Sequence, residues 1–112
     1  MSLIKKVTTA EFQLEVLDFS GVVLVDFYAD WCGPCKILAP ELAILSQELE
    51  ENKDVKIVSV DTEASPELAD NYQIRSIPNV IVFKNGNKLD EIIGLRDKEH
   101  YKRIIFEALL KS

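Results

Sequence analysis

The chain has 112 residues, 47% of them hydrophobic and 29% charged, and a formal net charge of -6 at pH 7. This length fits a single domain over residues 1–112, with a core that needs no metal or disulfide. The acidic balance argues against nucleic acid and anionic membrane as partners, because both require a cationic patch. No apolar run is long enough to span a membrane, and the start lacks the apolar core of a secretion signal, so we expect a cytoplasmic protein.

Two elements are predicted before the cysteines. Residues Thr8–Glu11 have the spacing of a capping box, which opens a helix. Phe12, Val16 and Leu17 are expected to face inward from this helix. Val22–Tyr28 is a β-branched and aromatic run without polar alternation, which is typical of a strand covered on both faces, so this strand should be central.

A long helix, a second strand and a short helix are predicted next. From Pro34 the apolar residues are spaced three and four apart, which indicates a helix that Pro40 should kink. Val55–Val60 indicates a second buried strand. Ser65–Pro66 supplies the N-cap and first-turn proline of a short helix that ends near Tyr72.

A hairpin and a final helix complete the chain. Val80–Lys84 and Leu89–Ile93 are the predicted strands, and the intervening Asn85–Gly86 is the preferred pair for a tight primed turn. The last helix follows Asp97, and its inward-facing residues are Tyr101, Ile104, Ile105, Ala108 and Leu109. This alternation of strands and helices predicts an α/β sheet with helices on both faces.

Both cysteines lie in the segment DFYADWCGPCK, where the central strand gives way to the long helix. The free N–H groups and positive dipole end of that helix stabilise a thiolate at Cys32, which makes it a nucleophile near neutral pH. Cys35 lies one turn further on the same helical face, within reach of Cys32. A loop of about four residues gives a disulfide worth only roughly 2 kcal/mol, so this pair is better suited to thiol–disulfide exchange.

A pair of cysteines can also belong to a metal site or to a binding module. A structural zinc site requires four ligands, whereas the chain offers two cysteines and His100 on a distant helix, so we expect no metal. No glycine-rich nucleotide motif is present, so we expect no nucleotide cofactor. A docking module without turnover, and an oxidase or isomerase, stay open because the motif fixes neither turnover nor direction.

The motif Trp31-Cys32-Gly33-Pro34-Cys35-Lys36, with Ile77–Pro78 and Gly94 at fitting distances, resembles the thioredoxin family over essentially the whole chain. The resemblance implies the thioredoxin fold, a five-stranded mixed sheet of order 1-3-2-4-5 flanked by four helices. It also implies a cis Ile77–Pro78 bond facing the cysteines. The implied activity is that of a protein thiol-disulfide oxidoreductase acting mainly as a protein-disulfide reductase. Disulfide-containing client proteins and an NADPH-dependent thioredoxin reductase are the implied partners of a monomer.

The resemblance also implies roles for individual residues. Cys32 and Cys35 would cycle between dithiol and disulfide through a mixed disulfide with the client. Asp26 lies on the same strand face as Leu24, and its burial should raise its pKa so that it can accept the Cys35 proton. The expected docking surface around Cys32 is formed by Trp31, Gly33, Pro34, Ile77, Pro78 and Gly94.

The sequence departs from the family pattern at two positions. Tyr28 stands where many members have a second tryptophan. Many members also carry a lysine that faces the buried aspartate from the third strand, and Ile57 is the residue aligned with it here. Lys56, one position away, should point to the opposite face. Asp26 is therefore expected to lack a nearby cation.

Overall fold

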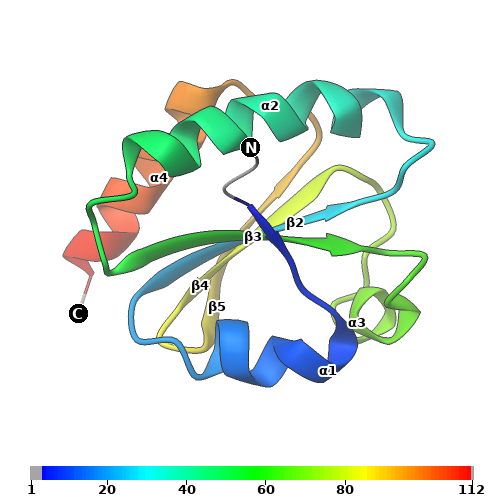
Figure 1. The fold of residues 1–112 in the computed structure, drawn as a ribbon, viewed down its shortest axis with the longest axis horizontal. Helices are drawn as coiled ribbons and strands as arrows, with labels where there is room; N and C mark the ends of the chain where they lie inside the picture. The colour runs from blue at the N-terminus through cyan, green and yellow to red at the C-terminus, as the bar shows by residue number, and fades with distance from the viewer. Residues whose placement is uncertain (1–3, 112) are drawn as a thin grey trace.

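The computed structural model describes residues 4–111 and places one sheet between two helical layers (Figure 1). The strands are β1 (Lys5–Lys6), β2 (Val22–Tyr28), β3 (Val55–Asp61), β4 (Asn79–Lys84) and β5 (Asn87–Ile93). The helices are α1 (Thr9–Phe12), continued by a π-helical segment η1 (Gln13–Leu17), α2 (Gly33–Glu48), α3 (Pro66–Asn71) and α4 (Lys98–Leu110). α2 and α4 cover one face of the sheet, and α1 and α3 cover the other.

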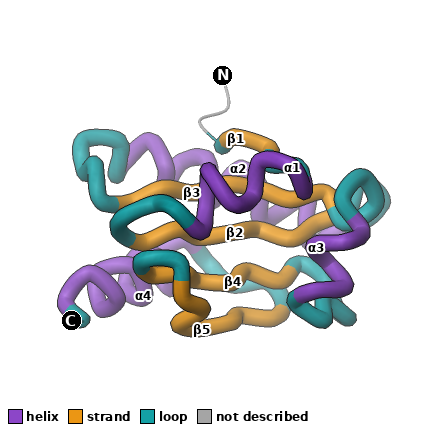
Figure 2. The backbone as a smooth tube through the Cα atoms, turned by 90° about the horizontal axis from the view of Figure 1, so that it is seen from below, coloured by secondary structure: helices purple, strands orange, loops and turns teal. Residues whose placement is uncertain are grey.

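The strand order is β1-β3-β2-β4-β5, as the resemblance implied (Figure 2). β3 pairs in parallel with β1 and β2, whereas β4 is antiparallel to β2 and β5. β2 is therefore central, in agreement with its unbroken apolar run. Within residues 4–111, no helix has the length and apolarity needed to cross a membrane.

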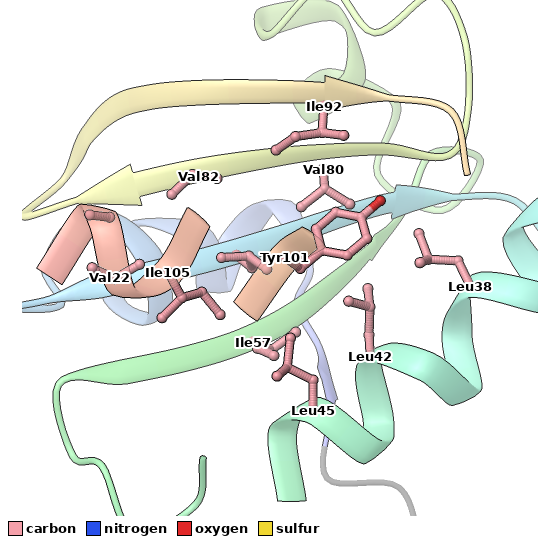
Figure 3. Close-up of a cluster of buried hydrophobic side chains, with 12 residues drawn as sticks. Val22, Leu38, Leu42, Leu45, Ile57, Val80, Val82, Ile92, Tyr101 and Ile105 are labelled. Atoms are coloured by element: carbon pink, nitrogen blue, oxygen red, sulfur yellow. The ribbon is translucent and has the colours of Figure 1, made fainter. Parts of the chain in front are cut away.

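Two core clusters lie on opposite faces of the sheet. The cluster beneath α2 and α4, hereafter the α2/α4 core, is shown in Figure 3. Its buried members are Val22, Leu24, Leu38, Leu42, Leu45, Ile57, Val80, Val82, Ile92, Tyr101, Ile105 and Ala108. The cluster beneath α1 and α3 includes Val23, Val25 and Phe27. Because strand side chains alternate between faces, Asp26 continues the series of Leu24 and faces the α2/α4 core.

The helices follow the predicted positions with local differences. The capping box at Thr8 and Glu11 is present, but the first helix changes to the π form after Phe12. Phe12 and Val16 are buried, and Leu17 is half-buried. α2 continues through Pro40 as one helix, held by four residues whose side chains are buried beneath it: Cys35, Leu38, Leu42 and Leu45.

The hairpin and the last helix agree with the sequence pattern. Asn85 and Gly86 have φ angles of 51° and 82°, which suits the predicted primed turn. β5 begins at Asn87, directly after this turn and two residues before the predicted start. Asp97 caps α4 by accepting a hydrogen bond from the His100 N–H at 3.0 Å. Tyr101, Ile105 and Ala108 are buried, while Ile104 and Leu109 are half-buried against the same core.

Candidate active site

The cysteine pair lies at the start of α2 and forms a disulfide in this structure. Cys32 is the N-cap residue, and its Sγ accepts a hydrogen bond from the Cys35 N–H at 3.2 Å. Both cysteines are buried, with 4% of Cys32 and 3% of Cys35 exposed. Cys35 faces the sheet as part of the buried side of α2, whereas Gly33 and Pro34 are exposed.

The loop before β4 lies against Cys32. The Ile77–Pro78 peptide bond is cis, as the resemblance implied, and the Ile77 carbonyl oxygen lies 3.8 Å from Cys32 Sγ. Among the described residues, no backbone hydrogen bond involves Ile77. The buried Pro78 accepts a hydrogen bond at 2.9 Å from the N–H of Gly94, which has a φ of 94°. The structure therefore brings Ile77, Pro78 and Gly94 together beside the cysteines.

Trp31 lies next to the nucleophile position with 68% of its surface exposed. Its indole Nε1–H donates a hydrogen bond to Glu63 Oε2 at 2.8 Å, which restricts the orientation of the ring. Glu63 was not singled out from the sequence, because it lies in the turn after β3 with no motif around it. Its position beside Trp31 depends on how the end of β3 approaches the start of α2.

Asp26 is almost completely buried, with 3% of its surface exposed. Burial raises the pKa of its carboxyl from the usual 3.8 to about 7. Its Oδ1 has no hydrogen-bond partner among the described residues. A cavity of about 350 Å³ is lined by both Asp26 and Cys35, so the space between the carboxyl and the inner cysteine can admit water.

The register of β2 and β3 defines the surroundings of Asp26. Ser59 lies directly opposite Asp26, and Ile57, which takes the place of the family lysine, lies opposite Leu24 in the α2/α4 core. Ser59 also lines the cavity. The inference about Lys56 is confirmed: it points to the other face of the sheet, where its Nζ lies 3.2 Å from a carboxylate oxygen of Glu15.

Cations nevertheless lie at the rim of this cavity. The exposed side chains of Lys6 and Lys36 both line it, and Lys6 Nζ is 6.0 Å from the centre of the Tyr28 ring. Burial alone, however, accounts for the raised pKa of Asp26. Lys6 was missed because a two-residue strand carries no sequence signal. Among residues 4–111, this site included, no cluster of three or more His, Cys, Asp or Glu side chains is arranged to hold a metal ion.

Comparison with known proteins agrees with this geometry. The Thioredoxin family model matches residues 3–107. Thioredoxin of Staphylococcus aureus is 43% identical over 106 residues, which cover 95% of this chain and 98% of that protein. Thioredoxin 1 of Nostoc sp. (strain PCC 7120) is 45% identical over 94 residues, covering 84% and 86% of the two chains.

A solved structure is similar over almost the same range. It comes from work on the thiol resolving mechanism in yeast mitochondrial 1-Cys peroxiredoxin via glutathione/thioredoxin systems. The matched chain has a TM-score of 0.82 and 30% sequence identity, and the match covers 96% of this chain and 99% of that chain. With its bonded Cys32–Cys35 pair at the start of α2, the chain therefore belongs to the thioredoxin family and is a thiol-disulfide oxidoreductase.

Proposed function

We propose that this protein acts mainly as a reductase of protein disulfides. The observation that carries the proposal is the position of Cys32, which caps α2 and lies 3.8 Å from the Ile77 carbonyl oxygen. The helix N-terminus favours a Cys32 thiolate once the disulfide is reduced. The Ile77 N–H and carbonyl make no backbone hydrogen bonds within residues 4–111, so they are available to an extended client segment.

The cycle consists of two exchange steps. The Cys32 thiolate attacks a client disulfide, so that a Cys32–client bond forms while one client sulfur leaves as a thiolate and takes a proton from water. Cys35 then gives its proton to the Asp26 carboxylate and attacks Cys32 Sγ. The Cys32–Cys35 bond forms as the bond to the client breaks, and the second client sulfur leaves as a thiolate that takes a proton from water. The client then has two thiols, this protein is oxidised, and Asp26 returns the Cys35 proton to water. Asp26 can accept this proton because both residues line one cavity.

The protein also requires a source of electrons for each new cycle. As a thioredoxin-family protein it works with disulfide-containing clients and with a reductase. We infer that the reductase is an NADPH-dependent thioredoxin reductase, and that the protein works in the cytoplasm as a monomer of one domain. Both core clusters pack against the same five-stranded sheet, one on each face, and this supports a single domain.

The proposed activity is tested by following dithiothreitol-driven reduction of a disulfide-linked test protein. The unmutated chain should accelerate the reaction strongly, whereas Cys32→Ser should give only the rate of dithiothreitol alone, since Cys32 is the cysteine that caps α2 beside Ile77. Acceleration that persists in the variant would exclude Cys32 as the nucleophile. No acceleration by the unmutated chain would favour a docking module without turnover.

The direction of the reaction needs a separate measurement. The purified protein should be equilibrated against glutathione redox buffers and its Cys32–Cys35 pair titrated. A reductase should remain oxidised in buffers that keep glutathione largely reduced, because its disulfide is the more stable one. A pair that is oxidised only as readily as glutathione itself would contradict the reductase assignment.

The docking role of Trp31 leads to a prediction about client affinity. Trp31→Ala removes a large exposed aromatic surface beside Cys32 and should raise the KM for a protein disulfide roughly tenfold. Reduction of a small aromatic disulfide, which does not need the full surface, should change less than about twofold. Leu110→Ala, at the far end of α4, removes another exposed apolar side chain and serves as the control (Figure 1). Equal losses with both substrates would show that Trp31 acts on the cysteines and not on docking.

A further inference from the structure

The Tyr101 hydroxyl is an unusual feature of the α2/α4 core. Tyr101 has no exposed surface, and its neighbours in this cluster are aliphatic. Among residues 4–111 the hydroxyl has no hydrogen-bond partner. Buried polar groups in proteins are nearly always paired, so an unpaired phenol on an otherwise apolar face requires an explanation. Phenylalanine would fill the same volume without a polar atom.

The register places Asp26 on the face that Tyr101 covers. Leu24 and Val80 belong to the same core cluster as Tyr101. Asp26 lies two residues after Leu24 and directly opposite Val80 in the β2–β4 pair, so its carboxyl faces this cluster. Figure 3 shows the Tyr101 hydroxyl pointing away from α4, between Val80 and Leu38.

The two groups also interact electrostatically. The pKa of Tyr101 is raised to about 12, mainly by burial and next by the negative charge of Asp26, while Arg96 opposes this shift. The phenol therefore stays protonated across the physiological range and can act only as a donor toward a carboxylate. Asp26 Oδ1 is likewise without a partner in the described chain. The Tyr101 hydroxyl, a buried donor without a partner, therefore lies close enough to Asp26 for the carboxylate charge to shift its pKa.

The other polar groups around Asp26 lie at the cavity. They are Cys35 and Lys36 from α2, Lys6 from β1, Ser59 from β3, and Tyr28 and Asp30 at the end of β2. Arg96, which precedes α4, opposes the rise of the Tyr101 pKa through its charge and through its backbone N–H. Burial is the cause of the raised Asp26 pKa. The lysines at the rim of the cavity therefore do not offset the free energy needed to ionise the buried carboxyl.

We propose that Tyr101 is a positioning residue for the second exchange step: its hydroxyl, which makes no hydrogen bond to Asp26 in this structure, turns to donate one when the Asp26 carboxyl is ionised. This inference rests on the proposed function of Asp26 as the acceptor of the Cys35 proton. The bond stabilises the carboxylate before it takes that proton, and it weakens once Asp26 is neutral. Tyr101 itself exchanges no proton with substrate and touches no reacting sulfur.

Tyr101→Phe tests the proposal because it removes only the oxygen. The Asp26 pKa, followed by carboxyl-carbon NMR in the oxidised protein, should rise by about one unit, as expected on losing a hydrogen bond to a buried charge. The ionised fraction at pH 7 would then fall from about one half to about one tenth. The Cys35 step, measured in single turnover, should slow about fivefold at pH 7 and recover its normal rate above about pH 9.

Matched variants separate this role from packing. Tyr72→Phe removes a half-buried phenol oxygen beneath the opposite face of the sheet and should leave the Asp26 pKa unchanged. Tyr101→Leu also lacks the hydroxyl and should reproduce the pKa shift even if its core is less stable. An unchanged or lowered Asp26 pKa in Tyr101→Phe would overturn the proposal.

Asp26→Asn distinguishes failure of this inference from failure of the proposed function. If the Cys35 step keeps its rate in Asp26→Asn, the proton-accepting role is wrong, whatever Tyr101 does. If that rate falls in Asp26→Asn, adding Tyr101→Phe should cause no further loss, since no carboxylate remains to be stabilised. A further fivefold loss in the double variant would overturn the proposal and assign Tyr101 a role that does not pass through Asp26.

Discussion

Replacement of Cys35 by serine is expected to stop the cycle after the first exchange and to leave the protein bonded to its client through Cys32. Cys35 is one turn from Cys32, with Cα atoms 5.2 Å apart, so its attack is intramolecular. Well-oriented intramolecular groups act at effective concentrations far above those of any added thiol. Steady-state turnover with millimolar dithiothreitol should therefore fall by about a thousandfold or more.

The covalent complex is the direct measurement for Cys35→Ser. Non-reducing electrophoresis and mass spectrometry should show a one-to-one adduct linked through Cys32, which dithiothreitol releases. Cys32→Ser is the matched control, since it retains Cys35 and should form no adduct because only Cys32 caps the helix beside Ile77. An adduct of equal yield in that control, or normal turnover by Cys35→Ser, would contradict the assigned order of attack.

Most of the fold could be predicted because its strongest signals are local. The apolar run of β2 indicated a strand buried on both faces, and the structure places it at the sheet centre. The Asn85–Gly86 pair located the hairpin turn, and the capping box located the start of α1. The strand order and the cis bond before β4 came from the family resemblance, since no local pattern determines either of them.

The details that could not be predicted depend on contacts between distant segments. Ser59 lies opposite Asp26 because of the register between β2 and β3. A helix connects these parallel strands, so no tight turn fixes that register and the partner of Asp26 could not be read from the sequence. Glu63 reaches Trp31 only when the end of β3 approaches the start of α2. Tyr101 was correctly predicted as buried, but its relation to Asp26 depends on how α4 packs against the sheet.

Asp26→Asn is expected to stabilise the oxidised protein strongly at alkaline pH. The pKa of Asp26 is about 7 in the folded state, compared with 3.8 for an exposed aspartate. A group with a raised folded pKa contributes stability that is complete below its unfolded pKa and is lost as the pH rises through the folded value. About three pKa units correspond to roughly 4 kcal/mol, so the free energy of unfolding of the variant should exceed that of the unmutated protein by about this amount at pH 8.

The pH dependence of this difference identifies its cause. Urea unfolding of the two oxidised proteins should give nearly equal free energies at pH 4, where Asp26 is neutral in the folded state, and the difference should grow between about pH 4 and pH 7. Glu15, Glu48 and Glu91 have lowered pKa values, so their contributions are lost below about pH 4.5, and they cancel in the difference because both proteins carry them. A difference that is the same at pH 4 and pH 8 would mean that the variant changes packing and not charge. A gain confined to higher pH, together with a slower Cys35 step, would show that the unmutated protein keeps a destabilising buried carboxylate where its chemistry needs a base.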